Sequence, residues 1–195
     1  MLSVPSKDCP DSGLFQCSEE VQDLIFVFNA CFDASENTRL VRGNEEPIYL
    51  PWGHQGVSFA QVVFAHGYFA SALHEIAHWC IAGRQRRHKI DYDYWYESDG
   101  RSLEDQARFA AVEAKPQAIE WIFSVACGKK FNISLDNLSV DHSQFGDFRM
   151  AVWQQAITLQ MQGLPERAER FRQALVHTYN TESDLKKYDL DLKQL

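Results

Sequence analysis

The sequence predicts a single α+β domain that is mainly helical and carries a small β-sheet. Its 195 residues fit one domain of ordinary size. Several long segments place apolar side chains at helical spacing, whereas only three short apolar runs have the length and composition of strands. No repeat, low-complexity tract or linker divides the chain.

Capping residues, apolar spacing and turn residues set the boundaries of the expected elements. In chain order these are a helix that begins after Ser18, extended runs at residues 39–41 and 48–50 around a Gly43-Asn44 turn, a buried strand at 62–64, a helix at 68–82 that ends at Gly83, an extended segment at 90–96, a helix from Ser102 to about Cys127, a helix at 143–162 that stops at Gly163, and a last helix opened by Pro165. We expect residues 1–17 to form a poorly ordered extension, 18–182 the domain, and 183–195 a charged tail that frays.

Charge and cysteine content narrow the function classes. With 19 basic and 27 acidic residues, the net charge of -8 argues against a nucleic-acid-binding protein. The 5 cysteines are odd in number and contain no CxxC pair, and in the absence of a secretory signal the simplest interpretation is reduced thiols in the cytoplasm. We find neither the apolar core of a secretory signal nor a run of about 18 apolar residues, so we expect a cytoplasmic protein that does not span a membrane.

The segment His74-Glu75-Ile76-Ala77-His78 predicts a metal site. Residues four apart lie on one face of a helix, so the imidazole nitrogens of His74 and His78 can bind one ion. Glu75 lies beside that face, where a carboxylate can accept a proton from a metal-bound water. The alternative is coincidence, but the motif falls on an amphipathic helix that follows a strand, which is the context that the chemistry requires.

Two histidines leave the site incomplete, and we expect Glu113 to supply a third ligand. It lies on the next long helix, just before Pro116, which removes a backbone hydrogen bond and should bend that helix. The alternative is a solvent-facing glutamate, which is how we interpret Glu104 and Glu120.

Two further features are candidates for roles at the metal site or in substrate binding. His66, just ahead of the metal helix, is either a catalytic group near the metal or a structural histidine at a strand end. The segment 91–97 mixes carboxylates with aromatic rings, so Asp91, Asp93, Tyr94 and Trp95 can hold an ammonium group. The alternative for this segment is a half-buried strand.

A basic stretch at residues 84–89 follows the metal helix. Cations favour the C-terminus of a helix, so a solvated helix end is one interpretation. The other is a docking patch for an acidic partner, in which Arg84, Arg86 and Arg87 speed the encounter.

Seven motifs, in register over roughly residues 20–180, resemble the elongation factor P hydroxylase family of bacteria. They lie at residues 37–40, 46–51, 63–67, 74–83, 112–118, 131–138 and 163–167. The resemblance implies a mainly helical fold with a small sheet, unlike the jelly-roll of common oxygenases. It also implies hydroxylation of the lysine of elongation factor P that carries a β-lysyl group.

The resemblance implies a ligand set as well. His74 and His78 match the family's two histidine ligands and Glu113 its carboxylate, a set that suits non-haem Fe(II) and O2, with zinc taken up on isolation. Glu75 then becomes a further ligand or a neighbour of the ligands. The modified lysine of the substrate is a long cationic arm, which residues 91–97 could bind. Elongation factor P is acidic, so residues 84–89 could form its docking patch.

Several alternatives stay open on the sequence alone. HExxH followed by a glutamate is also the pattern of a zinc metallopeptidase. A non-catalytic partner of the translation machinery is the third interpretation. The requirement for 2-oxoglutarate is open too.

Overall fold

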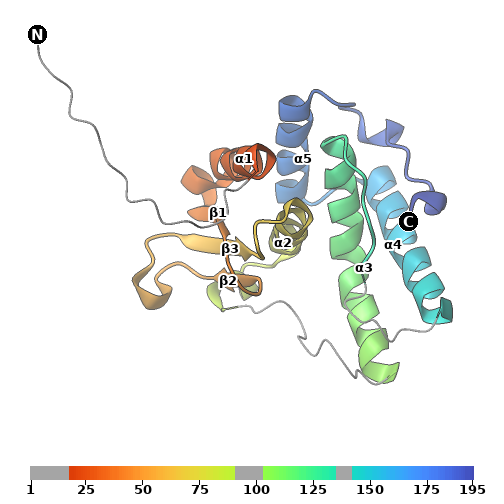
Figure 1. Ribbon diagram of the computed structural model, residues 1–195, viewed down its shortest axis with the longest axis horizontal. Coiled ribbons are helices and arrows are strands. Elements are labelled where there is room, and N and C mark those ends of the chain that lie inside the picture. Colours follow the sequence, from red (N-terminus) through yellow and green to blue (C-terminus); the bar gives the residue numbers. More distant parts are fainter. Residues whose placement is uncertain (1–17, 91–102, 135–141) are drawn as a thin grey trace, which may run out of the picture.

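The computed structural model describes residues 18–90, 103–134 and 142–195. A three-stranded sheet lies at one end of the molecule, and helix α2 lies between this sheet and the long helix α3 (Figure 1). The elements are α1 (Glu19–Glu36), β1 (Thr38–Arg42), β2 (Ile48–Leu50), β3 (Ala60–Phe64), α2 (Phe69–Ile81), α3 (Leu103–Ala126), α4 (His142–Gln162) and α5 (Glu166–Tyr179). The predicted α+β class, mainly helical with a small sheet, is confirmed.

The order of the strands differs from the order that a local turn would give. The strands lie in the order β1-β3-β2, so β3 separates the two runs on either side of Gly43-Asn44. β3 pairs in parallel with β1, with Leu40 opposite Val62, and antiparallel with β2, with Tyr49 opposite Val62. The three extended runs were predicted correctly, but the Gly43-Asn44 turn does not join neighbouring strands.

An aromatic cluster fixes helix α2 against α1 and α5. The ring of Trp79 lies 4.7 Å from that of Phe32 and 5.2 Å from that of Phe28, and the ring of Phe171 lies 5.8 Å from that of Phe28. These four residues are at most 4% exposed. Aromatic rings at such distances attract one another, which stabilises the fold beyond the free energy gained by burying them. This cluster therefore fixes the position of α2.

The two ends of α2 are set by neighbouring segments. Just before its start, His66 and Gly67 form a turn with positive φ angles of 51° and 76°, and the Ala65 N–H donates a 3.0 Å hydrogen bond across this turn to Ser71 Oγ. At its end, Ala82 is extended and Gly83 does not adopt the left-handed conformation expected of it. Arg167 of α5 contacts the last carbonyl groups instead, so a tertiary contact takes the place of a glycine cap.

The C-terminal segment is packed, although we expected it to fray. Tyr188 and Leu190 are buried in the core. The Trp153 indole N–H donates to the Leu190 carbonyl oxygen at 3.0 Å, and Arg172 donates to Tyr188 Oη at 3.0 Å. Two apolar side chains within the charged sequence therefore anchor it to α4 and α5.

The predicted end of α4 agrees with the structure. α4 ends at Gln162, and Gly163 follows it with a φ of 94°, the left-handed conformation expected there. α3 continues as a helix on both sides of the buried Pro116, and a bend at this residue stays a prediction. No helix in the described ranges has the length and apolar character needed to cross a bilayer.

Candidate metal centre

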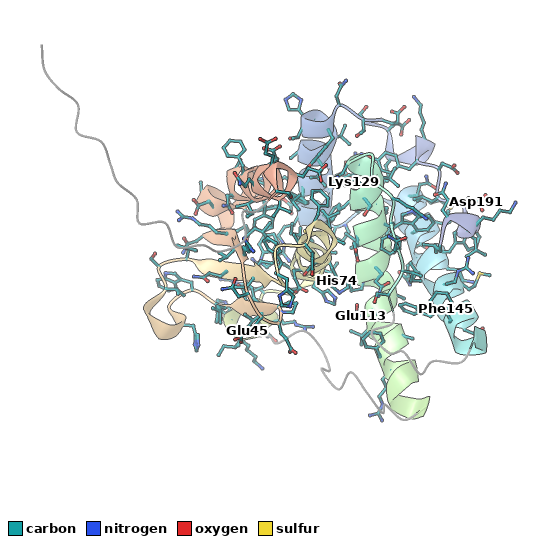
Figure 2. All side chains as sticks on the ribbon, viewed as in Figure 1. Glu45, His74, Glu113, Lys129, Phe145 and Asp191 are labelled. Atoms are coloured by element: carbon teal, nitrogen blue, oxygen red, sulfur yellow. The ribbon has the colours of Figure 1, made fainter. Side chains whose placement is uncertain are left out.

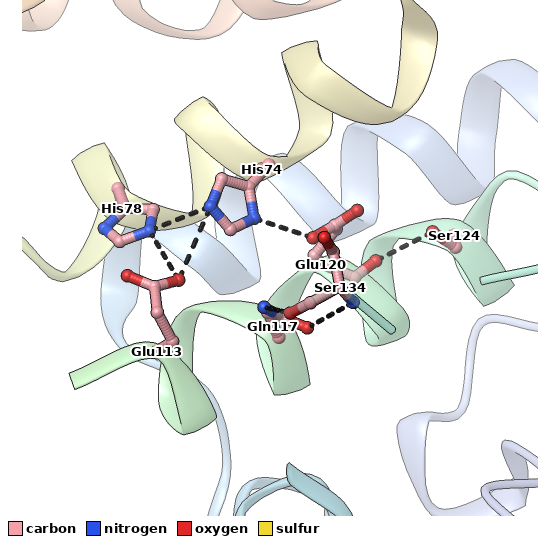
Figure 3. A network of polar contacts seen from close by, with 7 residues as sticks. All are labelled: His74, His78, Glu113, Gln117, Glu120, Ser124 and Ser134. Atoms are coloured by element: carbon pink, nitrogen blue, oxygen red, sulfur yellow. Dashed lines mark hydrogen bonds and ion pairs between the residues drawn. The ribbon is translucent and has the colours of Figure 1, made fainter. Parts of the chain in front are cut away.

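Helix α2 presents its two histidines on the face that packs against α3. The predicted amphipathic character of α2 is confirmed, because its apolar stripe, formed by Leu73, Ile76 and Ala77, is almost fully buried against the core. His74 and His78 are adjacent to this stripe and point toward α3, where Glu113 lies opposite them (Figures 2 and 3). The helical spacing of four residues therefore places both imidazoles at one junction between two helices.

Three potential ligand atoms meet at this junction. His74 Nε2 lies 3.1 Å from His78 Nε2, His78 Nε2 lies 3.2 Å from Glu113 Oε2, and His74 Nε2 lies 3.5 Å from Glu113 Oε2. Two ligands that each lie about 2.1 Å from one ion are themselves about 3.0–3.4 Å apart at octahedral or tetrahedral angles. The residues therefore fit a shared metal ion, and they match the two-histidine, one-carboxylate donor set of non-haem iron sites.

The Glu113 carboxylate is inward, with only 3% of the residue exposed. An ionised carboxylate in such surroundings needs charged or hydrogen-bonding partners, and the two imidazoles supply them. The solvent-facing alternative is therefore wrong for this residue.

Glu120 was interpreted as solvent-facing, and that interpretation is also wrong. It is 6% exposed, and its Oε2 lies 2.8 Å from His74 Nδ1. Its position two helical turns after Glu113 puts both carboxylates on the α3 face toward α2, as Figure 3 shows. The same face carries Gln117 and Ser124, so the spacing 113, 117, 120, 124 was the signal that could have found it.

The charges around His74 change its protonation. Burial by itself lowers the pKa of His74, but the hydrogen bond to Glu120 and the negative charges of Glu120, Glu75 and Glu113 raise that pKa well above its usual value. The carboxylates around His74 therefore favour a positive charge at this junction.

Comparison with known proteins identifies the family. The family model described as elongation factor P hydroxylase matches residues 27–189 of the chain. The chain belongs to the elongation factor P hydroxylase family. An elongation factor P lysine hydroxylase of Haemophilus influenzae is 48% identical over 173 residues, which cover 88% of this chain and 97% of that relative. The resemblance and the expectation of a hydroxylating enzyme are thereby confirmed.

In this family member a small cavity adjoins the junction. Its volume is about 30 Å³, enough for a water molecule or a slender group. Its wall includes Tyr49, Glu75, His78, Trp79, Arg86 and Arg87. His78 therefore faces the ligand cluster and also lines the cavity.

Glu75 is buried and lines this cavity, and it is not among the ligand atoms that cluster within 4.8 Å of one another. His66 is exposed, and its ring lies 5.8 Å from that of Tyr68. It too is outside the described ligand cluster. Catalytic roles for Glu75 and His66 therefore stay predictions.

The basic stretch is only partly exposed. Arg84 is exposed, whereas Arg87 forms a 2.6 Å ion pair with Glu36 and Arg86 is half-buried in the cavity wall. Arg87 thus has a structural contact in addition to any role in docking. The proposed ammonium-binding residues, Asp91, Asp93, Tyr94 and Trp95, lie outside the described residues.

Proposed function

We propose that this chain hydroxylates the β-lysyl-modified lysine side chain of elongation factor P at a metal held by His74, His78 and Glu113. The observation that carries the proposal is the meeting of these three ligand atoms in a chain that matches the family over residues 27–189. The name of the Haemophilus influenzae relative supports the same substrate. Because elongation factor P acts in translation, the reaction belongs in the cytoplasm.

Fe(II) is the metal that we propose, because two imidazoles and one carboxylate leave positions open for other ligands. When bound, iron supplies the activation of O2. In the overall reaction one oxygen atom enters a C–H bond of the substrate, and two electrons from a reductant convert the other to water. Zinc fits the same ligands and can replace iron during isolation. Family membership favours this reaction over peptide hydrolysis by a zinc enzyme.

The cavity beside His78 is the proposed place for the reacting part of the lysine arm. The ring of Trp79 and the apolar part of Tyr49 offer it a surface, and the Glu75 carboxylate supplies negative charge toward a cationic chain. The residues that follow α2 border the same cavity. A partner docked on Arg84, Arg86 and Arg87 would thus present its side chain to the cavity, with Asp91, Asp93, Tyr94 and Trp95 as further contacts for its ammonium groups.

The test uses purified protein loaded anaerobically with Fe(II), β-lysylated elongation factor P, a reductant and 18O2, each with and without 2-oxoglutarate. Mass spectrometry should show one 18O atom on the modified lysine. His74→Ala and His78→Ala should abolish it, whereas His177→Ala, at an exposed histidine of α5, should not. Hydroxylation by folded His78→Ala, or no incorporation by the parent in either arm, would contradict the proposal.

A further inference from the structure

A second buried carboxylate contacts the candidate metal centre from the side opposite the ligand cluster. Glu120 Oε2 lies 2.8 Å from Nδ1 of His74, whereas Nε2 of the same ring lies 3.1 Å from His78 Nε2 (Figure 3). One imidazole therefore bridges a carboxylate on α3 and the proposed metal position.

The two nitrogens of a neutral imidazole have different roles, because one carries the proton and the other a lone pair. A carboxylate only accepts hydrogen bonds when ionised, so the contact with Glu120 requires the proton on Nδ1. The lone pair then lies on Nε2, which points toward His78 and Glu113. Glu120 thus selects the tautomer that can bind a metal at the junction.

The position of Glu120 is itself fixed. Its backbone carbonyl oxygen accepts a 2.9 Å hydrogen bond from Ser124 Oγ, and its neighbours Ile119 and Trp121 are fully or almost fully buried. One turn earlier, Gln117 makes two hydrogen bonds to the backbone of Ser134, at 2.6 and 3.1 Å. Packing on both sides of α3 therefore limits where the carboxylate can move.

We infer that Glu120 is a positioning residue, which holds the His74 ring in the orientation and tautomer that present Nε2 to the metal. This inference rests on the metal centre of the proposed function. Burying a carboxylate is costly, and at this place the hydrogen bond to an imidazole offsets that cost. Partners of this kind also make the ligand a stronger base, and their loss commonly weakens metal binding by about 10–100-fold.

The first experiment measures the affinity for Co(II), whose visible absorption reports ligation, in the full-length chain. Glu120→Ala should weaken Co(II) binding by about 10–100-fold. Glu120→Gln, which keeps the volume but loses the charge, should weaken it less. Glu166→Gln, at an exposed glutamate of α5, is the control, and it should leave the affinity within about twofold of the parent.

The second measurement reads the hydrogen bond itself in Zn(II)-loaded, 15N-histidine-labelled protein. The parent and Glu166→Gln should show a downfield Nδ1–H proton of His74 that is protected from exchange with water. In Glu120→Gln this proton should move upfield, and in Glu120→Ala it should broaden by exchange. A residue with only a structural role would leave this resonance unchanged.

Folded Glu120→Ala that binds Co(II) as tightly as the parent would overturn the inference. If Glu120→Ala does not fold, Glu120→Gln decides, and an unchanged affinity together with an unchanged His74 resonance overturns it. A parent chain that does not bind Co(II) overturns it too. Parent protein that shows the expected dependence on Glu120 but does not hydroxylate elongation factor P would contradict the proposed function and support this inference.

Discussion

The guanidinium group of Arg167 lies 4.8 Å from the ring centroid of Trp79 and donates a 3.0 Å hydrogen bond to the carbonyl oxygen of the same residue. It also donates to the carbonyl oxygens of Cys80, at 3.0 Å, and of Ala82. A side chain of α5 thereby donates to backbone carbonyl groups at the end of the helix that carries both histidines, and the carbonyl group of Trp79 also accepts from the Ala82 N–H.

Replacing Arg167 with Met should lower the free energy of unfolding by about 2–3 kcal/mol, because hydrogen bonds from a charged donor are lost and carbonyl groups stay half-buried without them. Arg167→Lys should recover only part of this, since an ammonium group lacks the planar guanidinium that lies over the Trp79 ring. Urea unfolding provides the measurement. Arg84→Met, at an exposed arginine near the same helix end, is the control, and an equal loss in both Met variants would contradict the prediction.

Replacing Glu113 with Gln should weaken Co(II) binding more than Glu120→Gln does, because it removes a proposed ligand rather than a partner of one. Hydroxylation of elongation factor P should fall with it. Competition with a chelator of known affinity gives the binding constants. Glu166→Gln, at an exposed glutamate, should bind like the parent, and a Glu113→Gln protein with the affinity of the parent would rule out Glu113 as a ligand.

Glu169 should make part of the stability depend on pH. Its hydrogen bond to Arg172, 2.6 Å for the shortest contact, lowers the pKa of this carboxyl below its usual value. A carboxyl whose pKa is lower in the folded state adds stability above the unfolded pKa of about 4.3, and this stability is lost as the pH falls through the folded pKa.

The parent should therefore be more stable than Glu169→Gln at pH 7, and the difference should shrink as the pH falls toward 3. Thermal unfolding of the two proteins across this range measures it. A difference that does not change with pH would show that the ionised carboxylate contributes nothing.

Leu190→Ala should lower the free energy of unfolding by about 2–4 kcal/mol, because Leu190 is only 5% exposed and its truncation leaves a cavity beside α4. Lys193→Ala, three residues later and exposed, should change it by less than about 0.5 kcal/mol. Chemical denaturation distinguishes the two. If Leu190→Ala and the parent have equal free energies of unfolding, the C-terminal segment frays, as its charge led us to expect.

The sequence was sufficient to bring His74, His78 and Glu113 forward as candidate ligands, but not to predict the residues that position them. The spacing of His74 and His78 sets their common face, and apolar neighbours identify the buried stripe. Glu120 was missed because a glutamate on a helix is usually exposed, and only the packing of α2 on α3 makes its position internal. The inward orientation of Glu113 depends on the same packing.

The order of the strands and the packing of the C-terminal segment could not be predicted from the sequence, for a different reason. Hydrogen-bonding partners of β1 and β2 are set by the whole fold, whereas a Gly-Asn pair reports only on the local turn. Likewise, the charge of residues 183–195 gives no sign that Tyr188 and Leu190 reach the core.

The central place of β3 also has a consequence for the order in which the chain can fold during synthesis. When residues 38–50 leave the ribosome, both strands that they form still lack the ladder partner that they have in the sheet, because residues 60–64 emerge later. Pairing β1 with β2 first would give a non-native hairpin that must open before β3 can enter between them. A turn at Gly43-Asn44 would thus favour a pairing that the finished sheet does not contain, and β3 supplies the partner that both strands have in it.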